Sequence, residues 1–376
     1  MKTKAAVAYE PNAPLVLEEI ELDPPKAGEI LVKLKATGIC HSDLHAWKRE
    51  WSMMPFPVVL GHEGAGVVEQ VGEGVTHLQP GDPVLLTYLP ACGKCQWCHR
   101  GEPYLCDLTG MIASGKQLDG TSRMRGAGGT ELNHFLFVST FAQHTVAPAA
   151  SAVKMAPDVP LERVCLMGCG VTTGFGAAWR AVQVSPGDTV VVVGCGGLGL
   201  NTIQAAAMSG ASKIIAIDIH EEKLVLARQF GATHTIMNTH DLFGVVGQVM
   251  EITQGIGADY AFEVVGMEDV DETVAITFSS IRKGGTMVQV GVPSDSKTTT
   301  TISPFILSMY NKNVKGISFG RTQFHYDIPK LVDMYQAGKL KLDELVAEEL
   351  PLEQINKGFE NMIAGNKGAR TIIRMD

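Results

Sequence analysis

The sequence predicts an α/β protein of two domains, one built on a doubly wound parallel sheet and the other rich in β-strands. From about residue 171 to 311, unbroken apolar runs alternate with segments of helical spacing, as in "DTVVVVG" followed by "LGLNTIQAAAMSG". Buried parallel strands have this character, and strands that alternate with helices form βαβ units. The chain of 376 residues is also longer than a single core usually grows, which is about 250 to 300 residues.

Roughly the first 150 residues have a different pattern, typical of an all-β, barrel-like domain. Short β-branched and apolar runs are separated by turn-forming pairs such as Pro24-Pro25 and Pro80-Gly81. These runs are "KTKAAVAY", "LVLEEIEL", "EILVKLKATG", "GAGVVEQVG" and "DPVLLTYL".

The doubly wound part continues with "KIIAID", "HEEKLVLARQFGA", "ADYAFEVVG", "MEDVDETVAITFSSI" and "GGTMVQVGV". From about residue 312, the strand-like piece "VKGISF" is followed by amphipathic helices at "IPKLVDMYQAG" and "LEQINKGFENMIAG", and by the strand "ARTIIRM". We interpret this last part as a return to the first domain. The predicted domains are therefore residues 1–170 together with 312–376, and residues 171–311.

The composition argues against several classes of function. The formal net charge is −9 and the chain has no basic run, which argues against a nucleic-acid or anionic-membrane partner. No apolar stretch approaches the roughly 18 residues that a bilayer-spanning helix needs, and the N-terminal "MKTKAAVAYEPN" lacks the apolar core of a secretion signal. We therefore expect a cytoplasmic protein with its cysteines in a reducing compartment.

Half of the eight cysteines lie within the short segment "ACGKCQWCHRGEPYLCD". Their spacing allows four thiolates to surround one tetrahedral ion, and because this shell has no open position, the predicted ion is a structural zinc. Disulfides are disfavoured by strain and by the compartment, and a nucleic-acid-binding ribbon is disfavoured by the acidic charge. Reduced surface thiols without a metal are also compatible with the spacing. The predicted ligands are Cys92, Cys95, Cys98 and Cys106.

The segment "VVVVGCGGLGL" fits the G-x-G-x-x-G fingerprint of dinucleotide sites. It follows a strand and opens a helix, and Asp218 ends the next strand, as the fingerprint requires. Backbone N–H groups would bind the pyrophosphate. Asp218 would accept hydrogen bonds from the ribose hydroxyls, so NAD is predicted rather than NADP, although the nearby His220 and Lys223 favour the opposite interpretation. A glycine-rich turn that binds no ligand could have the same sequence motif. The predicted loop residues are Gly194, Gly196, Gly197, Leu198 and Gly199.

Two more segments, "TGICHSDLH" and "VVLGHEGAGVV", contain candidates for a second metal site. By spacing alone they remain candidates, because a lone Cys or His is more often a packed structural residue. Together with "CGKCQWC", "GCGVTTGFGA", "GCGGLG" and "VGVP", in this order, they resemble the zinc-dependent alcohol dehydrogenases of the medium-chain dehydrogenase/reductase family. The resemblance covers essentially the whole chain, and "MIASGKQLDGTSR" to "STFAQHTVAP" is similar to the class III-like, longer members.

This resemblance implies a GroES-like barrel as the catalytic domain, with the structural zinc lobe, and a Rossmann domain that binds NAD. It also implies that Cys40, His62 and Cys169 hold a catalytic zinc with one open position. Glu63 would lie behind the ion. Asp43 would accept the second N–H of His62 and so fix its tautomer.

Further residues are carried over from the family in the same way. Ser42 would touch the substrate oxygen, and His45 would end a proton relay that passes through the cofactor ribose. Zinc would favour loss of the alcohol proton, and the hydride would pass to the nicotinamide ring. The residues implied to lie near the cofactor are His41, Thr173, Lys223, Val265, Val290, Val292 and Arg370.

The implied activity is the reversible oxidation of a primary or secondary alcohol to an aldehyde or ketone, in a homodimer or homotetramer. Residues near Trp47, Trp51 and Met111 would suit an apolar pocket, and core packing explains them equally well. An S-(hydroxymethyl)glutathione dehydrogenase is less favoured, because "KREWSMMPFPV" lacks a clear acidic pair and "CDLTGM" lacks an arginine. The same motifs are compatible with a nicotinoprotein that keeps its NAD(H) permanently bound, and with a dinucleotide-binding protein that has no catalytic activity.

Overall fold

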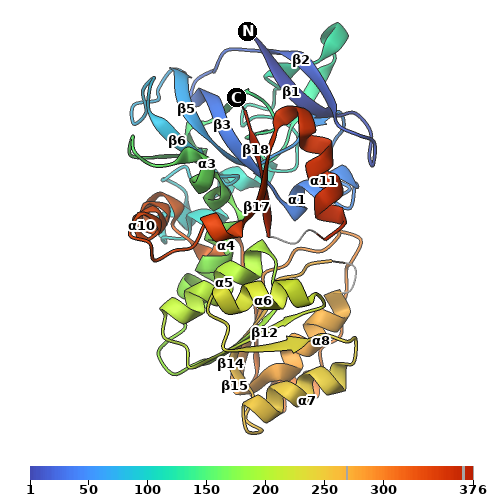
Figure 1. Ribbon diagram of the computed structural model, residues 1–376. Helices are drawn as coiled ribbons and strands as arrows, with labels where there is room; N and C mark the ends of the chain where they lie inside the picture. The colour runs from blue at the N-terminus through green and yellow to red at the C-terminus, as the bar shows by residue number, and fades with distance from the viewer. Residues whose placement is uncertain (268–269, 366–368, 376) are drawn as a thin grey trace. The chain divides into compact units, whose positions relative to one another are not determined.

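The computed structural model describes residues 1–267, 270–365 and 369–375 of the chain. Its helices and strands form two units (Figure 1). The first contains residues 1–169 and most of the C-terminal part from Gln323 onward, and the second contains Gly170–Thr322 together with Ala369. The first unit is thus assembled from both ends of the sequence.

Part of the first unit is a small closed barrel. Within the described residues, its strands follow the order β1-β2-β7-β8-β4, and β4 pairs back onto β1. The short side chains of Ala5, Ala6 and Ala8 are fully buried, so the first strand packs on both faces. The strands are β1 (Lys2–Ala8), β2 (Val16–Leu22), β4 (Val58–Val59), β7 (Met124–Arg125) and β8 (Glu131–His134).

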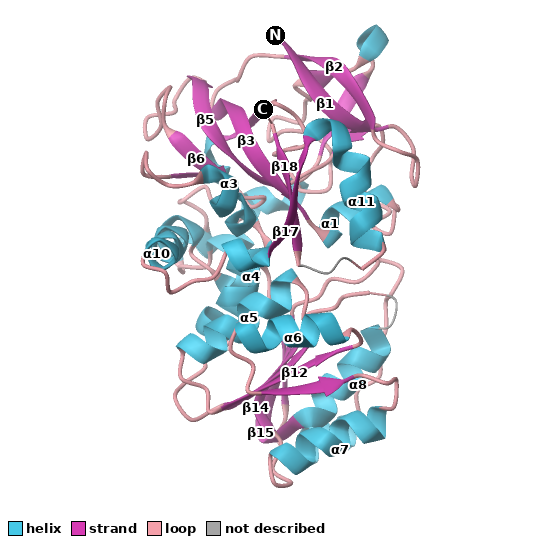
Figure 2. Cartoon of the chain, viewed as in Figure 1, coloured by secondary structure: helices cyan, strands magenta, loops and turns pink. Residues whose placement is uncertain are grey.

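A larger sheet in the same unit joins the two ends of the chain (Figure 2). Its order is β10-β6-β5-β3-β18-β17, and β9 pairs alongside β3. The C-terminal β18 is antiparallel to β3 and parallel to β17. The strands are β3 (Glu29–Ile39), β5 (Glu63–Val71), β6 (Pro83–Leu86), β9 (His144–Pro148), β10 (Ala152–Lys154), β17 (Val346–Pro351) and β18 (Arg370–Arg374).

Helices cover this β-structure with apolar faces. In α11, Ile355, Gly358 and Phe359 are buried at the spacing of one helix face. The ring of Phe359 lies 5.8 Å from that of Trp47 and 6.0 Å from that of Phe141. The helices are α1 (His41–Trp47), α2 (Gln96–His99), α3 (Leu161–Val164), α10 (Phe324–Gln336) and α11 (Ile355–Ile363).

The second unit contains a fully parallel sheet with the order β13-β12-β11-β14-β15-β16. Figure 1 shows α5 and α6 on one face of it and α7 and α8 on the other. The chain builds outward from β11 first in one direction and then in the other, so the strand order reverses between β11 and β14. The strands are β11 (Thr189–Val193), β12 (Lys213–Asp218), β13 (His234–Met237), β14 (Ala258–Glu263), β15 (Ile281–Gln289) and β16 (Asn313–Gly316). The helices are α4 (Gly170–Gly176), α5 (Gly197–Met208), α6 (Glu221–Gln229), α7 (Leu242–Ile252), α8 (Val270–Ser280) and α9 (Pro304–Met309).

The predicted return to the first domain at residue 312 differs from the structure. Strand β16 pairs in parallel with β15 and extends the second unit's sheet, and the first unit resumes only at Gln323. The side chains of this short strand are mostly exposed, so no apolar periodicity marks the sheet to which it belongs. No helix among the described residues combines the length and the apolar character needed to cross a membrane.

Candidate functional site

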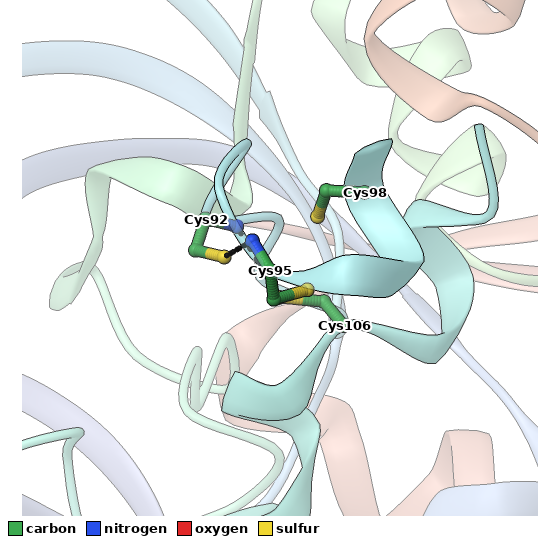
Figure 3. Close-up of side chains that lie close together, drawn as sticks. All are labelled: Cys92, Cys95, Cys98 and Cys106. Atoms are coloured by element: carbon green, nitrogen blue, oxygen red, sulfur yellow. Dashed lines mark hydrogen bonds between the residues drawn. The ribbon is translucent and has the colours of Figure 1, made fainter. Parts of the chain in front are cut away.

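Four cysteine side chains converge in the lobe that follows β6 (Figure 3). Cys95 precedes α2, and Cys106 lies between the short turns Pro103–Leu105 and Asp107–Met111. The sulfur atoms of Cys92, Cys95, Cys98 and Cys106 lie within 4.8 Å of one another. All four cysteines are free thiols, so no disulfide joins any two of them.

The donor set of the lobe fits a closed zinc site. The backbone N–H of Cys92 donates to the sulfur of Cys106, and that of Cys95 to the sulfur of Cys92, each at 3.3 Å. A hydrogen bond from the backbone of Cys98 lowers the pKa of Cys95 to about 6, whereas burial raises the pKa of Cys98 to about 12. Four thiolates this close together need a cation among them, and zinc would supply it.

A second group of ligand-type atoms is buried in the first unit. It consists of Cys40, His62, Glu63 and Cys169, whose sulfur, nitrogen and oxygen atoms lie within 4.8 Å of one another. Cys40 follows β3, His62 and Glu63 lie at the start of β5, and Cys169 follows the turn Cys165–Gly168. Three segments that are distant in sequence therefore meet at one point.

Among the described residues, the ring of His62 is hydrogen-bonded at one of its two nitrogen atoms. Its Nδ1 lies 3.0 Å from Oδ1 of Asp43, and both side chains are fully buried. The same carboxylate accepts the backbone N–H groups of Cys40 and Gly61 at 2.9 and 3.0 Å. Nε2 of His62 is buried and has no hydrogen-bond partner among the described residues. Because such a nitrogen is costly to bury alone, an ion shared with two sulfurs would satisfy it, and the residues fit zinc.

The groups of this cluster differ in their proton affinity. The adjacent Cys169 thiol and His62 lower the pKa of Cys40 well below its ordinary value. Interaction with Cys40, together with burial, raises the pKa of Cys169. Burial lowers the pKa of His62, but the Asp43 carboxylate and Cys40 together raise it well above its ordinary value. A bound cation would instead favour the neutral ring and two thiolates.

Arg370 lies against this cluster rather than free at the surface. Its Nη2 donates to Oε2 of Glu63 and, at 3.1 Å, to the carbonyl oxygen of Ile39. Burial lowers the pKa of Arg370, but Glu63, Cys40 and Cys169 together raise it above its ordinary value. The resemblance implied a role for Glu63 behind the ion and for Arg370 at the pyrophosphate. The structure joins the two residues in a buried ion pair.

The short helix α1 carries the residues of the predicted proton path. His41 is exposed, Ser42 is half-buried and His45 is buried. Nδ1 of His45 lies 2.5 Å from Oε2 of Glu50, and the imidazole ring stacks on Trp51 with 5.4 Å between centroids. Glu50 and Trp51 therefore fix the orientation of this ring.

In the second unit, the predicted dinucleotide loop joins β11 to α5. Gly194 has φ +104, which favours glycine. Gly196 precedes α5 without any side-chain cap, and no heavy atom of another segment lies within 4 Å of where its Cβ would be. Asp218 accepts the backbone N–H groups of Cys195 and His220 at 2.7 and 3.0 Å. Open backbone at a helix N-terminus fits an anionic pyrophosphate. The first turn of α5 contains Gly197, Leu198 and Gly199.

The other residues implied to lie near the cofactor are spread over the second unit. Thr173 belongs to α4, and its buried Oγ1 has no partner within the described part of the chain. Lys223 lies in the first turn of α6. Val265 and Val290 follow the parallel neighbours β14 and β15, and Val292 is exposed. The carboxyl ends of these strands share the sheet edge at which the glycine loop begins.

Most of the candidate pocket residues of the first unit lie at the margin of its core. Trp47, Trp51, Ile112 and Ala113 pack against the buried cluster that contains Met54. These four side chains are only partly buried, Met111 is exposed, and none of them identifies a substrate.

The sequence and the architecture both match known dehydrogenases. Residues 26–158 match the family described as the alcohol dehydrogenase GroES-like domain, and residues 197–337 match the zinc-binding dehydrogenase family. The NDMA-dependent alcohol dehydrogenase of Amycolatopsis methanolica is 42% identical over 374 residues, which cover 99% of each chain. Alcohol dehydrogenase B of Mycobacterium tuberculosis (strain ATCC 25618 / H37Rv) is 42% identical over 378 residues, which cover 100% of this chain and 98% of that protein. The chain belongs to the zinc-dependent alcohol dehydrogenases of the medium-chain dehydrogenase/reductase family.

Solved structures agree with this assignment. Benzyl alcohol dehydrogenase from Acinetobacter calcoaceticus superposes with a TM-score of 0.92 at 35% identity and covers 100% of both chains. An alcohol dehydrogenase zinc-binding domain protein from Burkholderia ambifaria gives 0.93 at 35% identity, covering 100% of this chain and 99% of that one. The predicted fold class, a GroES-like domain with a Rossmann domain, is confirmed, and this alcohol dehydrogenase is an oxidoreductase.

Two carboxylates of this alcohol dehydrogenase were missed by sequence reasoning. Glu50 contacts His45, and Glu263 is completely buried at the end of β14. No motif marks either residue. An acidic residue at the end of an apolar strand, as in "ADYAFE", was the one local signal for Glu263.

Proposed function

We propose that this alcohol dehydrogenase oxidises a mostly apolar primary or secondary alcohol to an aldehyde or ketone, reversibly, with NAD as the hydride acceptor. The buried group of Cys40, His62 and Cys169, with the partnerless Nε2 of His62, carries the proposal. These three residues would hold a catalytic zinc ion, and the four-cysteine lobe would hold a structural one. When bound, zinc would supply a Lewis acid for the alcohol oxygen, and NAD would accept the hydride.

The residues around the catalytic ligands would prepare them for the ion. Asp43 accepts a hydrogen bond from Nδ1–H of His62, so Nε2 would present its lone pair. Arg370 would neutralise Glu63, so that this carboxylate adds no net negative charge beside two thiolates.

Ser42 and His45 would move the substrate proton. Oγ of Ser42 would accept the proton of the alcohol hydroxyl and pass its own proton toward His45. Because Nδ1 of His45 is engaged by Glu50, the proton would arrive at Nε2 of the ring. The carboxylate of Glu50 would then offset the positive charge of the imidazolium.

NAD would bind with its pyrophosphate over Gly196 and its adenosine ribose near Asp218. The open backbone at the start of α5 supports the first placement. The carboxylate of Asp218 supports the second, and it would repel the 2′-phosphate of NADP.

A second candidate differs only in how the cofactor is held. The Amycolatopsis relative is named an NDMA-dependent alcohol dehydrogenase, and that dependence is typical of a nicotinoprotein. Such an enzyme would keep its NAD(H) and be reoxidised in place by another acceptor. The near-ultraviolet absorbance of reduced nicotinamide, measured in purified and dialysed protein after addition of alcohol, separates the candidates. A stoichiometric signal supports a nicotinoprotein, and its absence supports exchangeable NAD.

We also propose that the protein is a cytoplasmic homodimer or homotetramer. Strand β16 is an edge strand of the parallel sheet. Phe305 and Met309 of α9 and Val314 of β16 are exposed large apolar residues. Edge pairing with a second copy would cover both features. Light scattering tests the assembly, and a monomer at micromolar concentration contradicts it.

Metal analysis combined with an alcohol panel tests the catalytic assignment. Cys40→Ser should lose one zinc ion per chain and abolish turnover while leaving NADH binding nearly intact. Cys165→Ser is the matched control, because Cys165 is also a buried free cysteine of the first unit but belongs to neither metal group. Normal turnover of Cys40→Ser would show that the assignment is wrong.

A further inference from the structure

Glu263 is completely buried in the second unit and has no part in the chemistry proposed above. It is the last residue of β14, the strand beside β11. In open α/β sheets, ligands bind beyond the carboxyl ends of the strands where the strand order reverses. Here that point lies between β11 and β14. A buried carboxylate at this point is costly unless it is fully hydrogen-bonded.

Four donors surround the Glu263 carboxylate. Oε1 accepts the backbone N–H groups of Val265 and Gly266 at 3.0 and 3.2 Å and the hydroxyl of Thr273 at 2.9 Å. Oε2 accepts the side-chain amide of Gln289 at 2.5 Å. Burial raises the pKa of Glu263, whereas the backbone donors lower it. The donors come from the turn after β14, from α8 and from the end of β15, so one side chain connects three segments.

The turns after β14 and β15 pack closely around this carboxylate. A Cβ at Gly291 would lie 2.6 Å from Oε2 of Glu263, and a Cβ at Gly266 would lie 2.5 Å from the backbone of the turn after β15. A Cβ at Gly194 would lie 2.7 Å from Cγ2 of Val265. The turn after β14 therefore contacts the dinucleotide loop on one side and the turn after β15 on the other. Glu263 is hydrogen-bonded to the backbone of this turn.

We infer that Glu263 is a positioning residue for the nicotinamide half of the cofactor. It fixes the turns that carry Val265 and Val290, which would flank the nicotinamide ring, whereas the glycine loop and Asp218 serve the ADP-ribose half. The inference rests on the proposed NAD-dependent function. Loss of Glu263 should weaken binding of the dinucleotide and leave binding of its ADP-ribose half unchanged.

Glu263→Gln and Asp259→Asn form a matched pair of variants. In Glu263→Gln, the carbonyl oxygen can still accept from the backbone donors. Its NH2 group would face the side-chain amide of Gln289, so two hydrogen-bond donors would oppose each other. Asp259 lies near the opposite end of the same strand and accepts hydrogen bonds from the backbone of Thr189 and from Arg282 at 2.8 and 2.7 Å. Asp259→Asn removes the same charge away from the carboxyl end of the sheet.

Calorimetric titration of nucleotide-stripped protein with NADH and with ADP-ribose gives the readout. We expect Glu263→Gln to raise the Kd for NADH about tenfold, with an unchanged Kd for ADP-ribose, and Asp259→Asn to change neither. The inference is overturned if Glu263→Gln protein binds NADH with the wild-type Kd. It is also overturned if the affinities for NADH and for ADP-ribose fall by the same factor. Wild-type protein that binds neither ligand overturns the proposed function and the inference with it.

Gly291→Ala provides a second variant in case a buried glutamine prevents folding. It keeps the carboxylate, but its methyl group would push the turn after β15 away from the backbone of Gly266 and from Oε2 of Glu263. The same selective loss of NADH affinity is expected. Unchanged NADH binding in Gly291→Ala contradicts the inference on its own.

Discussion

Replacing Gly196 by Ala should weaken cofactor binding about a hundredfold and leave the fold unchanged. Gly196 has φ −76 and ψ −168, extended backbone that alanine adopts without strain. No heavy atom of another segment lies within 4 Å of the position of its Cβ. In the folded protein the methyl group therefore contacts nothing, and it meets only a ligand that approaches the backbone closely.

The expected effects can be worked out in free energy. The stability of the second unit should be unchanged or rise by about 0.4–1 kcal/mol, because alanine restricts the unfolded chain more than glycine does. Displacing the pyrophosphate from two backbone donors, each worth about 1.5 kcal/mol or more to a charged group, should cost about 3 kcal/mol, or about a hundredfold in Kd.

Gly199→Ala is the informative contrast. Its Cβ would lie 2.9 Å from the backbone carbon of Gly194 and closer still to the carbonyl oxygen, and real Cβ atoms essentially never come within 3.0 Å. This variant should lose about 1–3 kcal/mol of stability together with NADH binding. NADH fluorescence titration and urea unfolding measure both quantities. Gly196→Ala protein that binds NADH normally would refute the placement of the pyrophosphate.

Three further outcomes are expected. Arg370→Met leaves Glu63 buried without its cation, so urea unfolding should show a loss of about 3–5 kcal/mol, and unchanged stability would contradict the ion pair. Cys106→Ser should halve the zinc content measured by mass spectrometry, and full retention of zinc would argue against a metal in the lobe. Burial, with help from Arg123, lowers the pKa of His134 to about 3. Because the unfolded chain takes up this proton near pH 6.5, stability should fall by up to about 1.4 kcal/mol per pH unit between about pH 6 and pH 3, and His134→Gln should flatten that slope.

Features encoded within one segment were predictable from the sequence. The run Val190–Val193 is apolar on both faces, so its pattern indicates the buried parallel strand that β11 forms. The lobe cysteines and the glycine loop each lie on one continuous stretch, so their spacing alone indicates a site. Cys40, His62 and Cys169 come from three segments, and only the family resemblance connected them.

Features that depend on contacts between segments were not predictable. Arg370 and Glu63 pair only because β18 returns beside β3 at the far end of the sequence. The hydrogen-bond donors around Glu263 include side chains from α8 and β15, and no local sequence pattern indicates these contacts. Strand β16 lacks an apolar face, so its membership of the parallel sheet depends on pairing with β15.

The position of β18 between β3 and β17 has a consequence for biosynthesis. On the ribosome, the residues of the second unit emerge as one continuous stretch and can fold while the C-terminus is still inside the exit tunnel. Until β18 emerges, residues Ala36–Ile39 of β3 keep an open edge that can pair with other nascent chains. The nucleotide-binding unit should therefore fold before the unit that contains the metal-ligand residues. A prematurely terminated chain would still bind the nucleotide, but it would lack a complete metal-binding unit and would tend to aggregate.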